Sequence, residues 1–269
     1  LWDRVYISTL FTFHFDSIVK TIKFYKDAVG GTQSKIFVGG IMSTLMSKDV
    51  FEEAGIYPIP GVLTSAKQIR MDDDVNIDLL TPDYDILSGL PYATNDTYYG
   101  YTSRGCINHC AWCGVPRIEP CFVPYVDIKP MILEMRRKYG DKARLKLMDN
   151  NVLASPRLHQ IIEDLEALGY SRNAFTETQP RKQRVVDFNQ GVDASFINPQ
   201  NLELLSRLNI KPLRIAFDSI REKEVYIDAV RQSITAGFTE ISNHMLYNFI
   251  DTPSDLYQRL VINIRLNEE

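Results

Sequence analysis

The first part of the chain alternates between strand-like and helix-like apolar patterns. Residues 4–10 are rich in Val, Ile, Tyr and Leu and predict a buried strand. Apolar side chains then recur at helical spacing over residues 15–28. A second apolar run, 36–40, ends in a glycine pair, and a short helix is expected around 49–54. The order strand, helix, strand, helix predicts part of a parallel, doubly wound sheet within residues 1–70.

A second alternation begins after residues 71–97, which are rich in Asp, Pro and Tyr and predict a linker. Helical stretches alternate here with short apolar runs, and five β/α units of this kind predict a parallel barrel over residues 98–269. The strands are expected at 98–103, 144–148, 185–188, 213–217 and 240–247, and the helices at 129–139, 156–168, 199–208, 223–236 and from 251 onward.

Helix ends are marked by their own residue types. Ser155-Pro156 and Asn198-Pro199 each put a capping side chain before a proline in the first helical turn. Gly140, Gly169 and Gly237 each follow a predicted helix, where a residue with positive φ is favoured.

Composition limits the class of protein. The chain has 269 residues, of which 45% are hydrophobic and 24% charged, and its formal net charge is −4. These values are typical of a globular protein and exclude a disordered tail, a collagen-like repeat and a coiled coil. Without an apolar run of about 18 residues no membrane span is expected, and without a signal peptide the expected location is cytoplasmic. The acidic balance gives no indication of a nucleic-acid partner.

Both ends of the chain lie close to or within predicted elements. The sequence starts at Leu1, just before the first strand, and stops at Glu269 inside what reads as a helix. We therefore expect a fragment, with the missing half of the first sheet before Leu1 and a last barrel unit beyond Glu269.

The four cysteines are confined to residues 106–121. Cys106, Cys110 and Cys113 have the spacing Cys-x3-Cys-x2-Cys, and Trp112 directly precedes the third. Three thiolates this close can hold an iron–sulfur cube and leave its fourth iron without a protein ligand, as a catalytic metal centre requires. The loop follows the first predicted barrel strand, and barrel chemistry is found at the carboxyl ends of strands.

This spacing and the preceding aromatic residue resemble the radical SAM superfamily over residues 98–269, the first five units of its partial (β/α)6 TIM-like barrel. The resemblance implies that Cys106, Cys110 and Cys113 hold a [4Fe–4S] cluster and that the backbone of Trp112 lies near adenine. In the family, S-adenosylmethionine chelates the open iron, and reductive cleavage gives a 5′-deoxyadenosyl radical that abstracts hydrogen from a substrate. An electron donor such as flavodoxin or ferredoxin is implied, with an unknown small-molecule or peptide substrate.

Family geometry also implies further cofactor-binding positions. The second barrel strand ends in Met148-Asp149-Asn150-Asn151, where the family has a Gly-Gly-Glu-like edge that binds the amino group of S-adenosylmethionine. This chain departs from that pattern, and Asp149 or Asn150 would supply the acceptor. Gln190 and Asp218, at the ends of the third and fourth strands, would contact ribose, methionine or substrate, and Tyr247 would flank adenine.

The front part resembles the latter part of a cobalamin-binding, Rossmann-like domain. Ser8, Gly39 and Gly40 follow two successive strands, and in that family such small residues line the slot for the nucleotide tail of the cofactor. A cobalamin-dependent radical SAM methyltransferase or cyclase is therefore one alternative. A transfer-RNA methylthiotransferase is disfavoured, because its front domain carries three more cysteines and this chain has none before Cys106.

Other interpretations of the same residues stay open. The cysteines could bind structural zinc with His109 or Cys121 in a binding module without redox chemistry, or a ferredoxin-like cluster with Cys121. Residues 149–151 could cap the next helix. Asp218 could pair with an arginine, and Trp112 could be a core residue.

Overall fold

The computed structural model describes residues 2–269, which divide into two compact units. The first unit comprises the chain up to Leu80 together with Asn108–Cys121, and the second comprises Thr81–Ile107 and Phe122–Glu269. These boundaries differ from the expected division at residues 70 and 97, because the segment after Cys106 packs with the front of the chain. Across residues 2–269, the helices are too short or too polar to cross a membrane.

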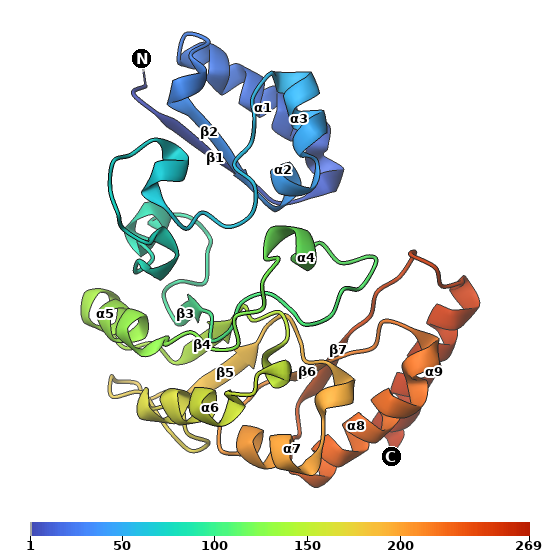
Figure 1. Ribbon diagram of the computed structural model, residues 1–269. Helices are drawn as coiled ribbons and strands as arrows, with labels where there is room; N and C mark the ends of the chain where they lie inside the picture. The colour runs from blue at the N-terminus through green and yellow to red at the C-terminus, as the bar shows by residue number, and fades with distance from the viewer. Residues whose placement is uncertain (1) are drawn as a thin grey trace. The chain divides into compact units, whose positions relative to one another are not determined.

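The first unit has a βαβ arrangement followed by two short helices (Figure 1). Strands β1 (Val5–Thr9) and β2 (Ile36–Gly40) pair in parallel, with Val5 opposite Ile36. Helix α1 (Phe15–Ala28) connects them and buries Val19 and Ile22. The strand-helix-strand order confirms the sequence prediction. Helices α2 (Ile41–Leu45) and α3 (Ser47–Ala54) follow; only the second was expected.

Gly40 permits a close approach between the ends of β1 and β2. Its φ is +101°, and a Cβ there would lie 2.3 Å from the carbonyl oxygen of Thr9. The Thr9 hydroxyl donates to the carbonyl of Gly39 at 2.9 Å and accepts from the Ser43 N–H at 2.9 Å. The contact with Thr9 and the positive φ therefore explain why position 40 is a glycine, without a bound ligand.

The second unit contains five parallel strands. Strands β3 (Thr97–Gly100), β4 (Arg144–Leu147) and β5 (Val185–Phe188) form one sheet in chain order, and β6 (Leu213–Ala216) pairs with β7 (Ile241–His244). Isolated parallel bridges, Val186 to Ile210 and Val192 to Ile215, connect the two sheets. The predicted order of strands is confirmed, and the chain is an α/β protein.

Helices follow the strands and cover one side of them (Figure 1). The residues that alternate along each strand explain this arrangement, because Leu145, Leu147, Val186 and Phe188 face the helices and are fully buried. The covering helices are α5 (Lys129–Tyr139), α6 (Leu158–Ala167), α7 (Pro199–Ser206), α8 (Lys223–Thr235) and α9 (Pro253–Glu268), and α4 (Val115–Ile118) belongs to the first unit.

Short 3-10 helices occupy many connections, including the predicted linker. They span Thr12–His14, Gln33–Lys35, Ala66–Ile69, Ile77–Leu79, Tyr84–Leu87, Val152–Ala154, Ala194–Phe196 and Ile220–Glu222.

The predicted helix ends are confirmed at some positions and not at others. Asn198 caps α7, since its side chain accepts from the N–H of Asn201 at 2.9 Å. The prediction at Ser155 was wrong: α6 begins two residues later than Pro156, and the Ser155 hydroxyl accepts from the N–H of Arg157 in the preceding turn. The glycines that follow α5, α6 and α8 all have positive φ: Gly140, Gly169 and Gly237.

Candidate site at the carboxyl ends of the strands

The sequence-predicted site residues of the second unit gather at one edge of the strands. Because the strands are parallel, the segments that follow them lie at a common edge. Asp149 follows β4, Gln190 follows β5, Asp218 follows β6 and Tyr247 follows β7, while the segment that leads to Cys106 follows β3.

Asp149 joins the ends of β3 and β4. It is buried, and its carboxylate accepts from the hydroxyls of Thr102 and Ser103, both at 2.7 Å, and from the Thr102 N–H at 3.0 Å. Burial raises the pKa of Asp149, and the hydrogen bonds from these two residues oppose that shift. Asp149 is thus engaged in holding the base of the cysteine loop and does not cap the next helix.

The segment between β3 and Cys106 is held in a defined path. Arg104 forms an isolated antiparallel bridge with Val123, and its guanidinium lies 3.7 Å from the centre of the Tyr101 ring. Gly105 has a φ of +68°, which favours glycine at this turn. The Nδ2 of Asn151, beyond β4, donates to Cys106 Sγ at 3.8 Å. Asn151 therefore brings a hydrogen-bond donor from the neighbouring strand end to the first motif sulfur.

The rest of the cysteine loop belongs to the first unit. The N–H of Cys113 donates to the carbonyl of Cys110 at 2.9 Å, and Cys113 Sγ accepts from the N–H of Val115 at the start of α4. Cys110 is exposed and Cys113 half-buried, and the Trp112 side chain is 41% exposed. The exposure of Trp112 contradicts the reading of this residue as part of a core.

The loop anchors itself on the first unit through α4. Leu45, in α2, contacts Gly114 so closely that a Cβ there would lie 3.2 Å from a Leu45 methyl group. The guanidinium of Arg117 donates to the Leu45 carbonyl at 2.9 Å. Arg117 therefore has a structural contact, in addition to its position near the motif.

The donor set suits an iron–sulfur cluster, since three soft thiol ligands lie within eight residues of sequence and none is a core residue. Among residues 2–269, however, no group of three or more His, Cys, Asp or Glu side chains has an arrangement that could hold a metal ion. The convergence of the thiols on one metal centre is therefore a prediction from their spacing.

The remaining predicted residues at this edge differ in burial and in contacts. Asp218 Oδ1 accepts a hydrogen bond from the N–H of Leu246 at 3.0 Å. The pKa of this carboxyl is raised, chiefly because the group is buried. The side chain of Gln190 is exposed, and Tyr247 is 46% exposed. Asn150 is half-buried. Asp218 forms no ion pair with the neighbouring Arg259, because the guanidinium of Arg259 pairs with Asp251 at 2.6 Å.

Two features of this region were missed in the sequence. The ring of His244, at the end of β7, reaches the carbonyl of Asn189 beyond β5 at 3.2 Å. On the strand face opposite the helices, Asp187 accepts two hydrogen bonds from Arg214, at 2.9 and 3.1 Å, and lies 4.0 Å from the ammonium of Lys146. The signal for this charged row was present in the sequence, because charged residues alternate with buried apolar residues in β4, and a single charged residue stands between apolar residues in β5 and in β6.

The predicted residues of the first unit lie at the carboxyl ends of its two strands. Ser8 is exposed and stands opposite Gly39 in the strand register. A Cβ at Gly39 would lie 3.7 Å from the Ile59 carbonyl oxygen, an ordinary contact with the chain itself. Because Gly40 is explained by its approach to Thr9, the glycine pair gives little support to a cofactor slot.

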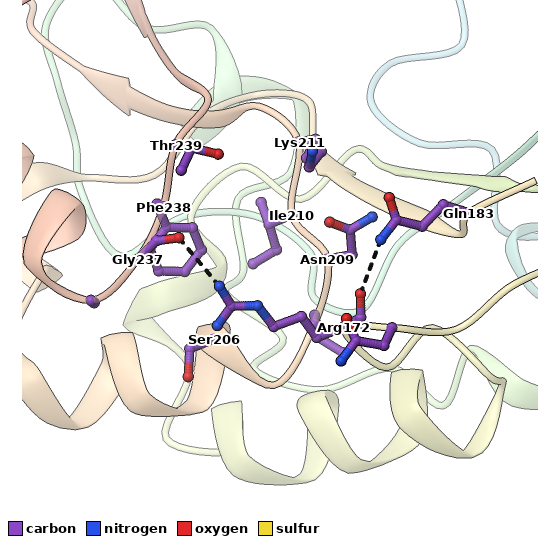
Figure 2. A pocket seen from close by; sticks show the side chains of 12 residues that line it. Arg172, Gln183, Ser206, Asn209, Ile210, Lys211, Gly237, Phe238 and Thr239 are labelled. Carbon is purple, nitrogen blue, oxygen red and sulfur yellow. Dashed lines mark hydrogen bonds between the residues drawn. The ribbon is translucent and has the colours of Figure 1, made fainter.

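Two cavities of the second unit both lie at the amino-terminal ends of the strands, away from the predicted site residues. One, of about 220 Å³, is lined by residues that precede β5, β6 and β7. Figure 2 shows the guanidinium of Arg172 beside Gly237, to whose carbonyl it donates at 3.3 Å. The other, of about 660 Å³, lies beside Tyr84 and Lys142. Neither is lined by the predicted site residues.

The chain was also compared with known proteins. Neither the protein-family models nor the curated proteins contain a match to it.

Proposed function

We propose that the chain carries the core of a radical SAM enzyme, in which Cys106, Cys110 and Cys113 hold a [4Fe–4S] cluster that cleaves S-adenosylmethionine reductively. The observation that carries this proposal is the Cys-x3-Cys-x2-Cys loop directly after β3, the first of five parallel strands. The reaction requires a one-electron donor such as flavodoxin or ferredoxin. Its proposed substrate is a small molecule or a peptide.

The proposed architecture is a partial TIM-like barrel. Three observations support it: the strands are parallel, they follow one another in chain order, and helices cover one face only. The uncovered face carries the charged row of Lys146, Asp187 and Arg214, which is consistent with a barrel interior that receives a polar ligand. For the front unit we propose half of a Rossmann-like domain, on the basis of its βαβ order.

The side chains of this edge would support the cluster in two ways. The Asn151 N–H donor at Cys106 Sγ would stabilise negative charge on that sulfur, and such hydrogen bonds raise the reduction potential of a cluster. Asp149 would fix the path into the loop through Thr102 and Ser103. When bound, the cluster supplies the electron that splits the sulfonium of S-adenosylmethionine. Asn150, Gln190, Asp218, Tyr247 and Trp112 are the proposed contacts of that cofactor.

The test is anaerobic reconstitution of the chain with iron and sulfide, followed by addition of reductant and S-adenosylmethionine. We expect a four-iron absorbance and Mössbauer spectrum and formation of 5′-deoxyadenosine. Cys106→Ala, Cys110→Ala and Cys113→Ala should each abolish the cluster. Cys121→Ala is the matched control, since it removes the one cysteine outside the motif and should leave the cluster intact.

A zinc-binding module is the alternative from another class. In that case the purified chain contains tight zinc, no cluster forms on reconstitution, and Cys121→Ala or His109→Ala lowers the zinc content. This result would overturn the radical SAM proposal. Cluster loss in Cys121→Ala, with iron retained in Cys113→Ala, would equally overturn the proposed set of three ligands.

A cobalamin-dependent methyltransferase or cyclase is a subtype of the proposal. It rests on Ser8 and Gly39 only, because contacts within the chain account for Gly40. Gel filtration of the chain after incubation with hydroxocobalamin tests it through the retained absorbance. Retention that is lost in Gly39→Leu would support the subtype, and an absence of retention would remove it without affecting the cluster proposal.

A further inference from the structure

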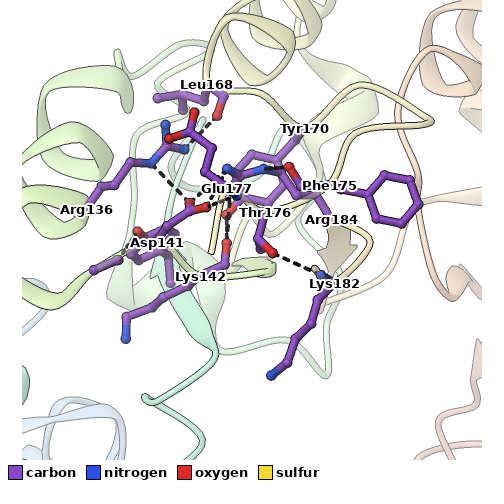
Figure 3. Close-up of polar contacts among 12 residues, drawn as sticks. Arg136, Asp141, Lys142, Leu168, Tyr170, Phe175, Thr176, Glu177, Lys182 and Arg184 are labelled. Atoms are coloured by element: carbon purple, nitrogen blue, oxygen red, sulfur yellow. Dashed lines mark hydrogen bonds and ion pairs between the residues drawn. The ribbon is translucent and has the colours of Figure 1, made fainter. Parts of the chain in front are cut away.

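A buried lysine lines the larger cavity of the second unit. Lys142, just before β4, is 5% exposed, and the cavity beside it has a volume of about 660 Å³. Figure 3 shows the Lys142 side chain directed away from the ion pairs around Asp141. The Lys142 amine therefore lies apart from the ion pairs that Asp141 forms next to the Lys142 backbone.

The partners of the Lys142 amine are a carbonyl and aromatic rings. Its Nζ donates to the Asn95 carbonyl at 3.2 Å and lies 5.8 and 5.9 Å from the ring centres of Tyr84 and Tyr98. Among residues 2–269, no carboxylate lies within ion-pair distance of it. The Asp96 carboxylate attracts it from farther away but pairs with Lys182 at 3.4 Å.

The tyrosine hydroxyls around the cavity are engaged elsewhere. Tyr98 donates to the Gly140 carbonyl at 2.6 Å, Tyr139 donates to Asp83 at 2.8 Å, and the Tyr84 oxygen accepts from the N–H of Tyr99 at 3.0 Å. Burial raises the pKa of Tyr84 to about 12, so its phenol is neutral and offers no counter-charge to the amine. Asp85, which also lines the cavity, pairs with Lys138 at 3.3 Å.

A protonated amine in this position lacks the charge partner that burial requires. Burial lowers the pKa of Lys142, and only the distant Asp96 opposes that shift. A desolvated lysine has a larger fraction of neutral amine at pH 7, and the neutral amine is the form that adds to carbonyl compounds. Apolar surface for the rest of such a ligand is supplied by Leu87, Leu90 and Pro91, which line the same cavity as the stacked rings of Tyr84 and Tyr139.

We infer that Lys142 is the reactive amine of a second site, which takes a small aldehyde in the cavity beside Tyr84 and Tyr139 and holds it as an imine. The amine lone pair attacks the carbonyl carbon and forms the C–N bond. The carbonyl oxygen then leaves as water with the two protons of the amine, so the step needs no oxidant or reductant. This site lies at the amino-terminal ends of the strands, and it is independent of the cysteine loop at their carboxyl ends.

The test uses benzaldehyde as the probe on the whole chain, with cyanoborohydride to trap the imine and peptide mass mapping to locate it. Lys48, whose side chain is 86% exposed, is the reference within the same molecule. Because burial lowers the pKa of Lys142, we expect labelling of Lys142 to exceed that of Lys48 severalfold at pH 7, and the ratio to fall toward one as the pH is raised to 10.

Lys142→Arg keeps the positive charge and removes the primary amine, so cavity labelling should vanish while Lys48 labelling is unchanged. The comparison within the unaltered chain needs no variant and holds even if Lys142→Arg folds poorly. Equal labelling of the two lysines at pH 7 would overturn the inference. So would a ratio that stays constant between pH 7 and pH 10, because it would show an ordinary ammonium.

Discussion

Two aspartates with largely covered side chains stand at the two ends of the same strand, β4, and are stabilised in opposite ways. Before the strand, Asp141 lies between two arginines, 2.8 Å from the Arg184 guanidinium and 3.5 Å from that of Arg136 (Figure 3). After the strand, Asp149 is held by hydroxyls and an N–H, without a cation among its hydrogen-bond donors. The amino-terminal end is thus closed by paired charges, whereas the carboxyl end retains a buried carboxylate whose pKa is raised.

This difference indicates how each of the two aspartates can respond to a ligand. Ion pairs with two arginines fix a charge and leave it little capacity to respond to a ligand. A carboxylate held only by neutral donors stays sensitive to any charge that arrives nearby, since it has no compensating partner. Of the two aspartates, Asp149 at the carboxyl end, where the candidate site lies, is therefore the one whose charge state a bound ligand can change.

The largest expected effect is at the amino-terminal end. Asp141→Ala leaves the Arg184 side chain, 4% exposed, without its counter-charge. We expect a loss of about 3–5 kcal/mol in the free energy of unfolding, measured by urea denaturation. Glu134→Ala removes an exposed pair with Arg137 on α5 and should cause no measurable change. Equal effects of the two variants would show that the buried pair does not stabilise this end.

Removal of the carboxylate at the other end should cost somewhat less. Asp149→Ala leaves the Thr102 N–H and the hydroxyls of Thr102 and Ser103 without their acceptor, and we expect a loss of about 2–4 kcal/mol. Hydrogen exchange should show the increased opening first at residues 101–106. Protection that falls uniformly over the second unit would contradict a local role at the base of the cysteine loop.

The pH dependence separates the two aspartates further. The pKa of Asp149 is raised in the folded chain, so the unfolded carboxyl ionises first as the pH increases. The stability that it contributes is greatest below its ordinary pKa, about 4, and falls until the pH passes the folded value. Asp149→Asn keeps an acceptor for Thr102 but has no carboxyl to titrate. The unfolding free energy of this variant should therefore not show the decline with rising pH that Asp149 causes. Parallel stability profiles from pH 4 to 8 would contradict the raised pKa.

Among the residues at the two ends of β4, the smallest expected effect on stability is at Asn151. Its Nδ2 donates only a long bond to Cys106 Sγ, and its buried Oδ1 has no hydrogen-bond partner among the described residues. Asn151→Ala removes both, and we expect a change of less than about 1 kcal/mol in unfolding free energy. In the reconstituted chain the same variant should lower the potential of the cluster. An unchanged potential would exclude a role for Asn151 at the cysteine loop.

The order and bounds of the elements could be predicted from the sequence to a large extent. Periodicity alone identified α1 at residues 15–28 and α5 at 129–139 with the bounds that the structure has. Helix α2 was not predicted because Ile41–Leu45 is only five residues long and too short for a helical period to be visible. The start of α6 was misplaced because the Ser155 hydroxyl caps a preceding turn instead of the helix.

The candidate site was predictable only in part, for a physical reason. The position of residues after parallel strands follows from topology, so the gathering of Asp149, Gln190 and Asp218 at one edge could be expected. Which side chains bond to one another could not. The bonds from Thr102 and Ser103 to Asp149 span 47 and 46 residues of chain, and such contacts depend on strand register and side-chain rotamers.

The chain-order neighbours in the sheet also bear on how the second unit folds. Pairing of β3 with β4 joins residues 97 and 144, a separation of 47, whereas pairing of β6 with β7 joins 213 and 241, a separation of 28. The entropy of loop closure favours the shorter pairing by only about 0.5 kcal/mol. Tyr98, Leu145 and Leu147 are fully buried in the first pair, whereas the second pair has only Leu213 and Ile215 of β6 fully buried and no residue of β7. The greater burial at β3 and β4 outweighs this difference in entropy. We expect the folding nucleus at β3 and β4, with β6 and β7 joining later.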